Sequence, residues 1–229
     1  MVFSSVSFLF FFLPAFLLCY TLLPYRNTML LAFSALFYVW GEGVFVLVLL
    51  LSVAINYIAG RKISSANEHR SKLPLAIGIA ANLLLLVYFK YFGFLVFDLL
   101  GLKQLDPNLV PHLPLGISFF TFQSISYLVD VYRQRAPPAK NVWDLALYIM
   151  MFPQLIAGPI VRYASVARQI RRRAVHFNYA FHGLMFFAVG LSQKVLVANN
   201  VAGVADGIFG LPLDSLSTQI AWTGALAYT

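Results

Sequence analysis

Long apolar runs, separated by short polar stretches, dominate the pattern of hydrophobic positions along this chain. A helix needs about 20 apolar residues to cross a bilayer, because each residue advances it by about 1.5 Å. The runs that reach this length are Val2–Leu23, Leu73–Leu100, Leu113–Tyr132 and Asn178–Val201. This pattern predicts an all-α fold, a polytopic bundle of transmembrane helices.

Shorter apolar segments complete the pattern. Met29–Trp40 and Val44–Ala59 flank a Gly-Glu-Gly turn, and we expect them to form a helical hairpin. A last apolar run, Ile220–Thr229, ends the sequence. No basic residue precedes the first apolar run and no small-x-small cleavage site ends it, so we expect a retained helix rather than a secretion signal. We see no internal repeat or linker and interpret residues 1–229 as a single membrane domain.

The apolar segment Val142–Ile160 is too broken for a regular span. It contains Pro153 and Pro159, neither of which can donate a backbone hydrogen bond, and Gln154 lies between them. Non-helical backbone at membrane depth survives only where protein buries it or where it lines a wet cavity. We therefore predict a re-entrant segment beside an interior cavity or tunnel that opens to the cytoplasm. A kinked ordinary helix is the alternative.

The distribution of basic residues supports the re-entrant interpretation. Lysine and arginine cluster at residues 61–72, again at 133–140, and again at 162–173. Cytoplasmic loops carry an excess of these residues. If Val142–Ile160 crossed the membrane fully, one of the last two clusters would lie outside. A segment that enters and returns keeps both clusters inside.

The composition also indicates a membrane protein. Of the 229 residues, 61% are hydrophobic and 10% are charged, whereas soluble domains have about 45–50% and about 25%. The net charge is +8. We interpret this charge as loop charge that sets the topology, and we expect no nucleic acid partner. Cys19 is the single cysteine, which excludes an intrachain disulfide and a cysteine-based zinc site.

A polar stripe follows the span that begins at the sequence PLG. Gln123, Ser126, Tyr127 and Asp130 fall on one helix face, which should point into the bundle because lipid cannot satisfy their hydrogen bonds. The stripe either forms the wall of a substrate pathway or only bonds to neighbouring helices, and the sequence leaves both possibilities open. Near the cytoplasmic end we expect an ion pair between Asp130 and Arg133.

The remaining polar groups in apolar surroundings suggest no chemistry. Lys90 and Lys194 are expected to snorkel to the membrane interface. None of the histidines is centred in a span or has a carboxylate at helical spacing; they are His69, His112, His176 and His182. The sequence shows no catalytic dyad, nucleophile elbow, phosphate loop or metal motif. We therefore assign no catalytic residue and no metal site in this chain.

Several motifs, in order and at familiar spacing, point to a known family. These are LPLGISFFTFQSISYLVDVYR, then FPQLIAGPIVRY, then QKVLVANNVAGVAD, together with the opening MVFSSVSFLFFFLP and the tetrapeptide YFKY. Together they resemble the N-terminal half of a membrane-bound O-acyltransferase of the alginate O-acetyltransferase type. The resemblance runs nearly from end to end of this sequence.

The resemblance implies a tunnel-bearing enzyme of the bacterial inner membrane. Such an enzyme takes an acyl group, here expected to be acetyl, from a cytoplasmic donor such as acetyl-CoA or another acyl carrier. It passes the group across the membrane for O-acylation of an exported polysaccharide such as alginate. The implied partners are the lipid bilayer and extracytoplasmic polysaccharide-acetylation proteins, with no bound cofactor. D-alanyl transfer to teichoic acid, or a transporter or export component, remain alternatives.

The resemblance also implies a division of labour within the family. The catalytic histidine belongs to the second half, and no residue here matches it, so we expect this sequence to be a fragment that is inactive alone. The half described by this sequence would supply scaffold and tunnel wall. The residues expected near the tunnel are Gln123, Tyr127, Gln154 and Arg162.

Overall fold

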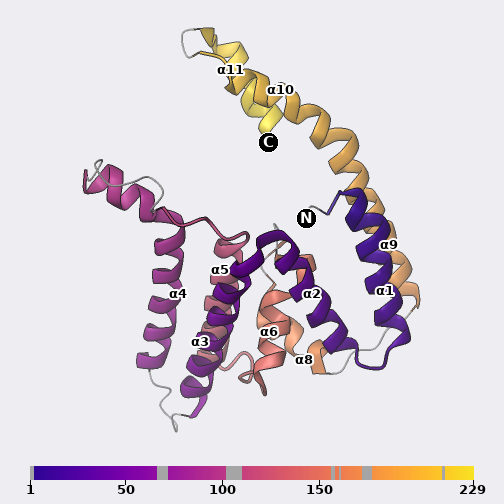
Figure 1. The fold of residues 1–229 in the computed structure, drawn as a ribbon, viewed down its shortest axis with the longest axis vertical. Coiled ribbons are helices and arrows are strands. Elements are labelled where there is room, and N and C mark those ends of the chain that lie inside the picture. The colour runs from indigo at the N-terminus through magenta and orange to yellow at the C-terminus, as the bar shows by residue number, and fades with distance from the viewer. Residues whose placement is uncertain are drawn as a thin grey trace. The chain divides into compact units, whose positions relative to one another are not determined.

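The computed structural model describes residues 3–65, 72–101, 110–155, 158–159, 161–171, 177–212 and 215–229. Within these ranges the chain is helical and contains no strand, which confirms the all-α prediction (Figure 1). The chain forms two compact units. Unit 1 consists of Met1 and Leu13–Arg173, and unit 2 consists of Val2–Phe12 and Ala174–Thr229.

The described helices include long apolar ones of the kind expected for a membrane protein. By length and composition, the helical runs Arg26–Ser64, Lys72–Leu99 and Asn178–Phe209 could each cross a membrane. Phe8–Leu22 is a shorter apolar helix, made of the π-helix η1 (Phe8–Phe12) and α1 (Leu13–Leu22). The structure thus confirms a polytopic helical fold.

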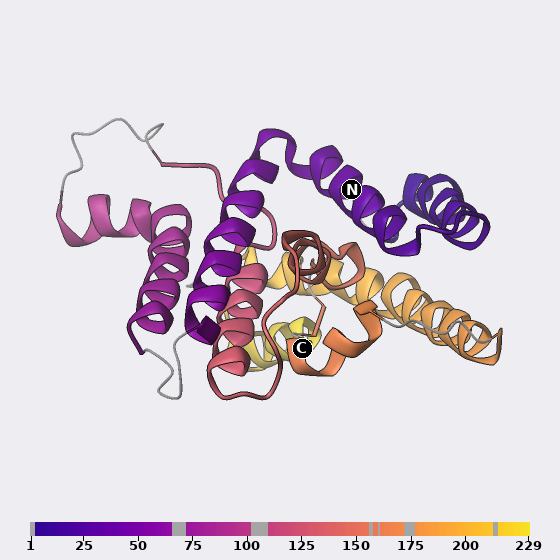
Figure 2. The same ribbon diagram turned by 90° about the horizontal axis from the view of Figure 1, so that it is seen from below.

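The chain turns between the two helices predicted as a hairpin. α2 (Arg26–Glu42) and α3 (Val46–Ser65) are joined by the short 3-10 helix η2 (Gly43–Phe45). Gly43 has a φ of 58°, a conformation that glycine adopts without steric cost. The helices splay apart after the turn, and α3 packs against α4 and α5 instead (Figures 1 and 2).

Three helices of unit 1 run side by side in both views. They are α3, α4 (Lys72–Gly93, continued by the π-helix η3, Phe94–Leu99) and α5 (Ile117–Tyr132) (Figures 1 and 2). α5 is shorter than the predicted Leu113–Tyr132. The residues before Gly116 are not helical, and Gly116 itself has a left-handed φ of 76°, so the helix begins only at Ile117. Its 16 residues span about 24 Å.

A buried pair of amides joins α3 to α4. Asn56 donates to Asn82 Oδ1 at 3.0 Å, and Asn82 donates back to Asn56 Oδ1 at 2.8 Å. The remaining N–H of each amide reaches a carbonyl one turn earlier in its own helix, that of Ser52 or Gly78. Both side chains are buried. The pair satisfies polar groups that hydrocarbon could not, and the sequence analysis did not single it out.

The broken segment, predicted as Val142–Ile160, follows α5; its described part contains two short helices, and a third comes directly after it. α6 (Val142–Met150) begins at Asn141, whose side chain accepts a hydrogen bond from Asp144 N at 2.7 Å. This is a regular helix N-cap. α7 (Phe152–Leu155) is a single turn, and α8 (Tyr163–Arg171) packs against α5 and α6. The predicted break therefore exists.

Unit 2 contains one long helical run and a helix that folds back on it. α9 (Phe177–Ser192), the π-helix η5 (Gln193–Ala198) and α10 (Asn199–Phe209) follow one another without a gap (Figure 1). The run exceeds the predicted span, which was expected to end at Val201. α11 (Thr218–Tyr228) packs along α10, where Gly224 lets the Ile208 side chain approach closely.

Candidate functional site

The helix break at Met151 leaves the backbone carbonyl of Tyr148 without its normal partner. In a continuous helix, the carbonyl of Tyr148 would accept from Phe152 N, but Met151 adopts φ −54° and ψ 114° and turns the chain away. Two side-chain amides bind this carbonyl instead. Gln123 Nε2 donates to it at 2.7 Å, and Gln154 Nε2 also donates to it. The two glutamines predicted near a tunnel therefore meet at one oxygen atom.

A serine from α2 satisfies the other side of the break. Phe152 N donates to Ser34 Oγ at 3.1 Å, and Ser34 Oγ donates to Leu30 O at 2.7 Å. Ser34 is fully buried. An unsatisfied buried backbone group is costly, so the break needs the hydroxyl of Ser34 and at least one amide donor on the Tyr148 carbonyl. Sequence reasoning missed Ser34, which is a lone hydroxyl within an apolar run.

Three buried tyrosines pack around the broken segment. The ring of Tyr163 lies edge-on to Tyr127 and to Tyr148, with centroid distances of 4.9 and 5.1 Å. Tyr127 Oη accepts a hydrogen bond from Ala139 N at 3.2 Å, and Tyr148 Oη donates to Val161 O at 2.7 Å. Gly60 of α3 allows the approach of the Tyr127 ring, since an added Cβ would meet its Cε1 at 2.8 Å.

The course of the chain confirms that the segment turns back. We call the described residues between Asn141 and Ala164 the return segment. Just before it, Ala139 bonds to Tyr127 in the last turns of α5. At its far point, Leu155 O lies against Gly116 at the start of α5, where an added Cβ would be only 2.6 Å away. The chain then returns, and Ala164 N donates to Asp130 Oδ2 at 3.4 Å.

Both ends of the return segment therefore lie beside the same end of α5. Contacts with other helices agree, because Tyr57 of α3 bonds to Lys140 O at 3.4 Å and Asn27 of α2 bonds to Ile170 O at 2.6 Å. A kinked helix that continued in one direction would leave its ends at opposite ends of α5. The geometry is that of a segment that enters and returns.

The predicted polar stripe on α5 is real, and its described contacts are hydrogen bonds to neighbouring segments. Gln123, Tyr127 and Asp130 are buried, whereas Ser126 is half-buried. The ion pair predicted between Asp130 and Arg133 does not form between these two described side chains. The Asp130 carboxylate instead takes the backbone N–H of Ala164, and Arg133 is exposed.

Arg162, the fourth residue expected near the tunnel, stands apart from the cluster. Its side chain is exposed, and its backbone carbonyl accepts from Ser165 N at 3.1 Å and from Ser165 Oγ at 2.7 Å. These bonds start α8. The structure thus joins Gln123, Tyr127 and Gln154 in one cluster and leaves the Arg162 side chain at the surface.

An open groove of about 480 Å³ lies between α2 and α6. Its lining is mostly apolar; the residues are Asn27, Thr28, Leu31, Ala32, Ala35, Trp143, Asp144 and Leu147. The polar members come from the first turns of both helices, at the end of unit 1 where the return segment begins and ends.

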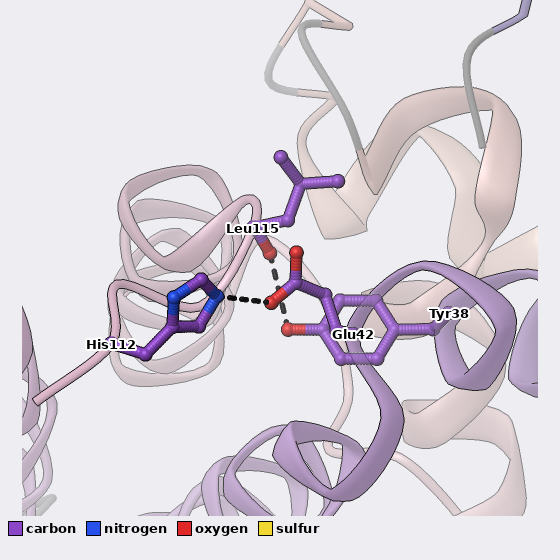
Figure 3. Close-up of polar contacts among 4 residues, drawn as sticks. All are labelled: Tyr38, Glu42, His112 and Leu115. Atoms are coloured by element: carbon purple, nitrogen blue, oxygen red, sulfur yellow. Dashed lines mark hydrogen bonds and ion pairs between the residues drawn. The ribbon is translucent and has the colours of Figure 1, made fainter.

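Two other contacts fix residues 112–115, which lead into α5. His112 Nε2 lies 3.3 Å from Glu42 Oε2, and Tyr38 Oη donates to Leu115 O at 3.1 Å (Figure 3). The His112 side chain is 65% exposed, so this contact adds little stability. Helical spacing could not reveal the pair, because 70 positions separate the two residues. It lies at the end of unit 1 opposite to the ends of the return segment.

The other histidines and lysines give no catalytic constellation. His182 Nδ1 lies 2.7 Å from Asn178 O in its own helix, and His69 and His176 lie outside the described residues. Lys90 is exposed near the Tyr91 ring, and Lys194 donates to Ser4 Oγ within unit 2. In the part of the chain that the structure describes, no group of three or more His, Cys, Asp and Glu could hold a metal ion.

These features define an integral-membrane helical protein with a return segment, and sequence comparison gives the class: the chain is homologous to O-acetyltransferases of the membrane-bound O-acyltransferase type. It is 40% identical to the probable alginate O-acetylase AlgI of Azotobacter vinelandii, over the whole chain and 47% of that protein. It is 40% identical to the AlgI protein of Pseudomonas aeruginosa, over 45% of that protein. It is 33% identical to the peptidoglycan O-acetyltransferase of Helicobacter pylori, over 50% of that protein.

The chain spans about half the length of the curated relatives it matches. No family model matches the chain. No solved structure matches it.

Proposed function

We propose that this chain forms part of an integral-membrane O-acyltransferase that carries an acetyl group across the bacterial inner membrane. The group comes from a cytoplasmic donor, acetyl-CoA or another acyl carrier, and ends on a hydroxyl of an exported polysaccharide such as alginate. The observation that carries this proposal is the return segment, which brings polar groups to mid-depth of unit 1 and keeps both its ends on one side.

The groove between α2 and α6 supports a route for the donor from the cytoplasmic side. Its polar mouth, with Asn27 and Asp144, lies at the end of unit 1 that carries the exposed basic residues Arg133 and Arg168. The acyl donors named above carry phosphate groups, which arginine binds well. Gln123, Tyr127, Gln154 and Arg162 remain our proposed tunnel-near residues, with Arg162 at the entrance and the other three inside.

The names of the relatives support acetyl as the transferred group. They are described as O-acetylases of alginate and as an O-acetyltransferase of peptidoglycan. These names favour acetyl over D-alanyl transfer, and they favour an enzyme over a transporter. Peptidoglycan is the second candidate acceptor because of the Helicobacter relative, but its identity of 33% is below the 40% of the alginate O-acetylases. Acetylation proteins outside the membrane would complete the transfer.

A chimera tests the proposal. Residues 1–229 replace the matching segment of the Pseudomonas aeruginosa alginate O-acetylase, in a strain that lacks its own copy. We expect acetate esters on the secreted alginate, measured chemically after alkaline release, and none in the strain with an empty vector. A chimera that reaches the membrane at normal levels but leaves the alginate without acetate would overturn the proposal. Acetate on peptidoglycan in place of alginate would favour the second acceptor.

A further inference from the structure

The two glutamines that bind the carbonyl of Tyr148 are not equivalent. Gln123 is buried, with 3% exposure, and sits in the middle of the regular helix α5. Gln154 is half-buried and belongs to the single turn of α7. A carbonyl oxygen has two lone pairs, and one hydrogen bond is enough to avoid an unsatisfied group. The bond from Gln123 meets that need by itself, so the bond from Gln154 is the one that can be released.

The backbone of Gln154 is closely packed, whereas its side chain is only half-buried. The chain returns directly over it, so that a Cβ added at Gly158 would lie 2.8 Å from Gln154 Cα. Among the described residues, the Gln154 amide has Tyr148 O as its single hydrogen-bond partner. A rotation of the Gln154 side chain would therefore expose an N–H donor without moving the backbone. The Tyr148 carbonyl would keep its hydrogen bond from Gln123.

We propose that Gln154 donates its amide N–H to the carbonyl oxygen of the transferred acyl group, while Gln123 keeps the helix break satisfied. This inference rests on the proposed function and assigns its acyl-binding residue. The depth is suitable, because Gln123 lies midway between Gly116 and Asp130, about 10 Å along α5 from either. An acyl carbonyl that passes this point has left water and needs a donor.

The same argument separates Gln154 from the tyrosines of the cluster. Tyr148 donates its hydroxyl proton to Val161 O, whereas Tyr127 Oη accepts from Ala139 N and is fully buried directly against Gly60 of α3. Each of these hydrogen bonds anchors the return segment or the chain just before it. Breaking either one would therefore destabilise the packing around the helix break. Gln154 differs from both tyrosines, because its hydrogen bond to the Tyr148 carbonyl is duplicated by that of the more deeply buried Gln123.

The test uses the chimera described above, with methionine in place of glutamine because methionine has similar length and no N–H donor. Gln154→Met is expected to reduce alginate acetate about tenfold or more, because removing one donor to a reacting carbonyl costs about 10²–10³ in rate. Its apparent melting temperature in detergent should stay within about 2 °C of the parent chimera, since a duplicated hydrogen bond is worth little. Gln169→Met, at an exposed position of α8, is the matched control and should change neither quantity.

Gln123→Met provides the contrast, because it removes the buried hydrogen bond that satisfies the Tyr148 carbonyl. We expect a clear fall in its melting temperature together with its acetate yield. If Gln154→Met melts as low as Gln123→Met, or disappears from the membrane, the Gln154 amide is structural and the inference is wrong. Full acetylation by Gln154→Met, with an active parent, also overturns it and leaves the proposed function intact. A parent chimera without acetate overturns the proposed function and this inference together.

Discussion

Tyr148 Oη donates a hydrogen bond to the backbone carbonyl of Val161, 2.7 Å away. The bond joins the outgoing helix α6 to the chain that comes back toward α8. Tyr148 is fully buried, so water cannot replace its hydroxyl. The same residue offers its own carbonyl to Gln123 and Gln154. Tyr148 therefore fixes the return segment from its side chain and from its backbone.

The hydroxyl of Tyr148 should contribute measurably to stability. Tyr148→Phe keeps the ring and leaves Val161 O without its donor, which costs about 1–2 kcal/mol. For a chain of this size the apparent melting temperature of the detergent-solubilised protein should fall by about 2–8 °C. Tyr57→Phe is the control, because the bond from Tyr57 to Lys140 O is 3.4 Å long and exposed. Equal melting temperatures for the two variants would show that the Val161 bond does not hold the segment.

The return of the chain predicts which face of the membrane each end of the segment meets. Single cysteines are placed at Asn141 and Ala164, both exposed, in a background in which Cys19 is alanine. Both should react with a membrane-impermeant maleimide in inverted vesicles and resist it in whole cells, because both ends lie at the basic end of unit 1, which we predict to face the cytoplasm. His112→Cys, at the opposite end of α5, should show the reverse. Labelling of Asn141→Cys and Ala164→Cys from opposite faces would exclude a return.

Helical periodicity predicted the polar face of α5 but not what that face binds. Spacing alone placed Gln123, Tyr127 and Asp130 on one side, and the structure confirms their burial. Their partners are backbone groups of Tyr148, Ala139 and Ala164. Those groups are available because the segment after α5 is irregular. A sequence shows that prolines break a helix, but it does not show which carbonyl or N–H the break sets free.

Lone polar residues in apolar runs were the signal that sequence reasoning overlooked. Ser34, Asn56 and Asn82 are each isolated among hydrophobic neighbours, and each turns out to be buried and hydrogen-bonded. Lipid gives such groups no partner, so each of them predicts a contact inside the protein. The choice of partner depends on helix packing, which is why Asn56 and Asn82, separated by 26 positions, could not be paired from spacing.

The Asn56–Asn82 pair predicts energetic coupling between α3 and α4. Asn82→Leu removes both inter-helix bonds and leaves the Asn56 carbonyl oxygen buried without its donor, so we expect a loss of about 1–3 kcal/mol. The double variant Asn56→Leu/Asn82→Leu should be more stable than the sum of the single losses implies, by about 0.5 kcal/mol or more. Thermal unfolding of the four proteins in detergent measures this coupling.

The control for this cycle comes from unit 2. Asn200 is exposed and bonds to Leu196 O in its own helix, so Asn200→Leu should leave the stability nearly unchanged. Strict additivity of the Asn56 and Asn82 losses would mean that the two amides do not support each other. The bonds would then have no part in holding α3 to α4.

Gly116 is predicted to be indispensable because two independent constraints meet there. Its φ of 76° lies in the left-handed region, and a Cβ would stand 2.6 Å from Leu155 O, a backbone atom that cannot rotate away. Gly116→Ala should therefore cost more than about 2 kcal/mol, through strain and displacement of the far point of the return segment. In the chimera it should lower the melting temperature and the acetate yield together.

Gly203→Ala is the matched control. An added Cβ there meets nothing within 4 Å outside its own helix, and alanine favours the helix, so stability should hold or rise. If both variants kept full stability and acetylation, Leu155 would not rest on the start of α5, and the return segment would not reach that depth.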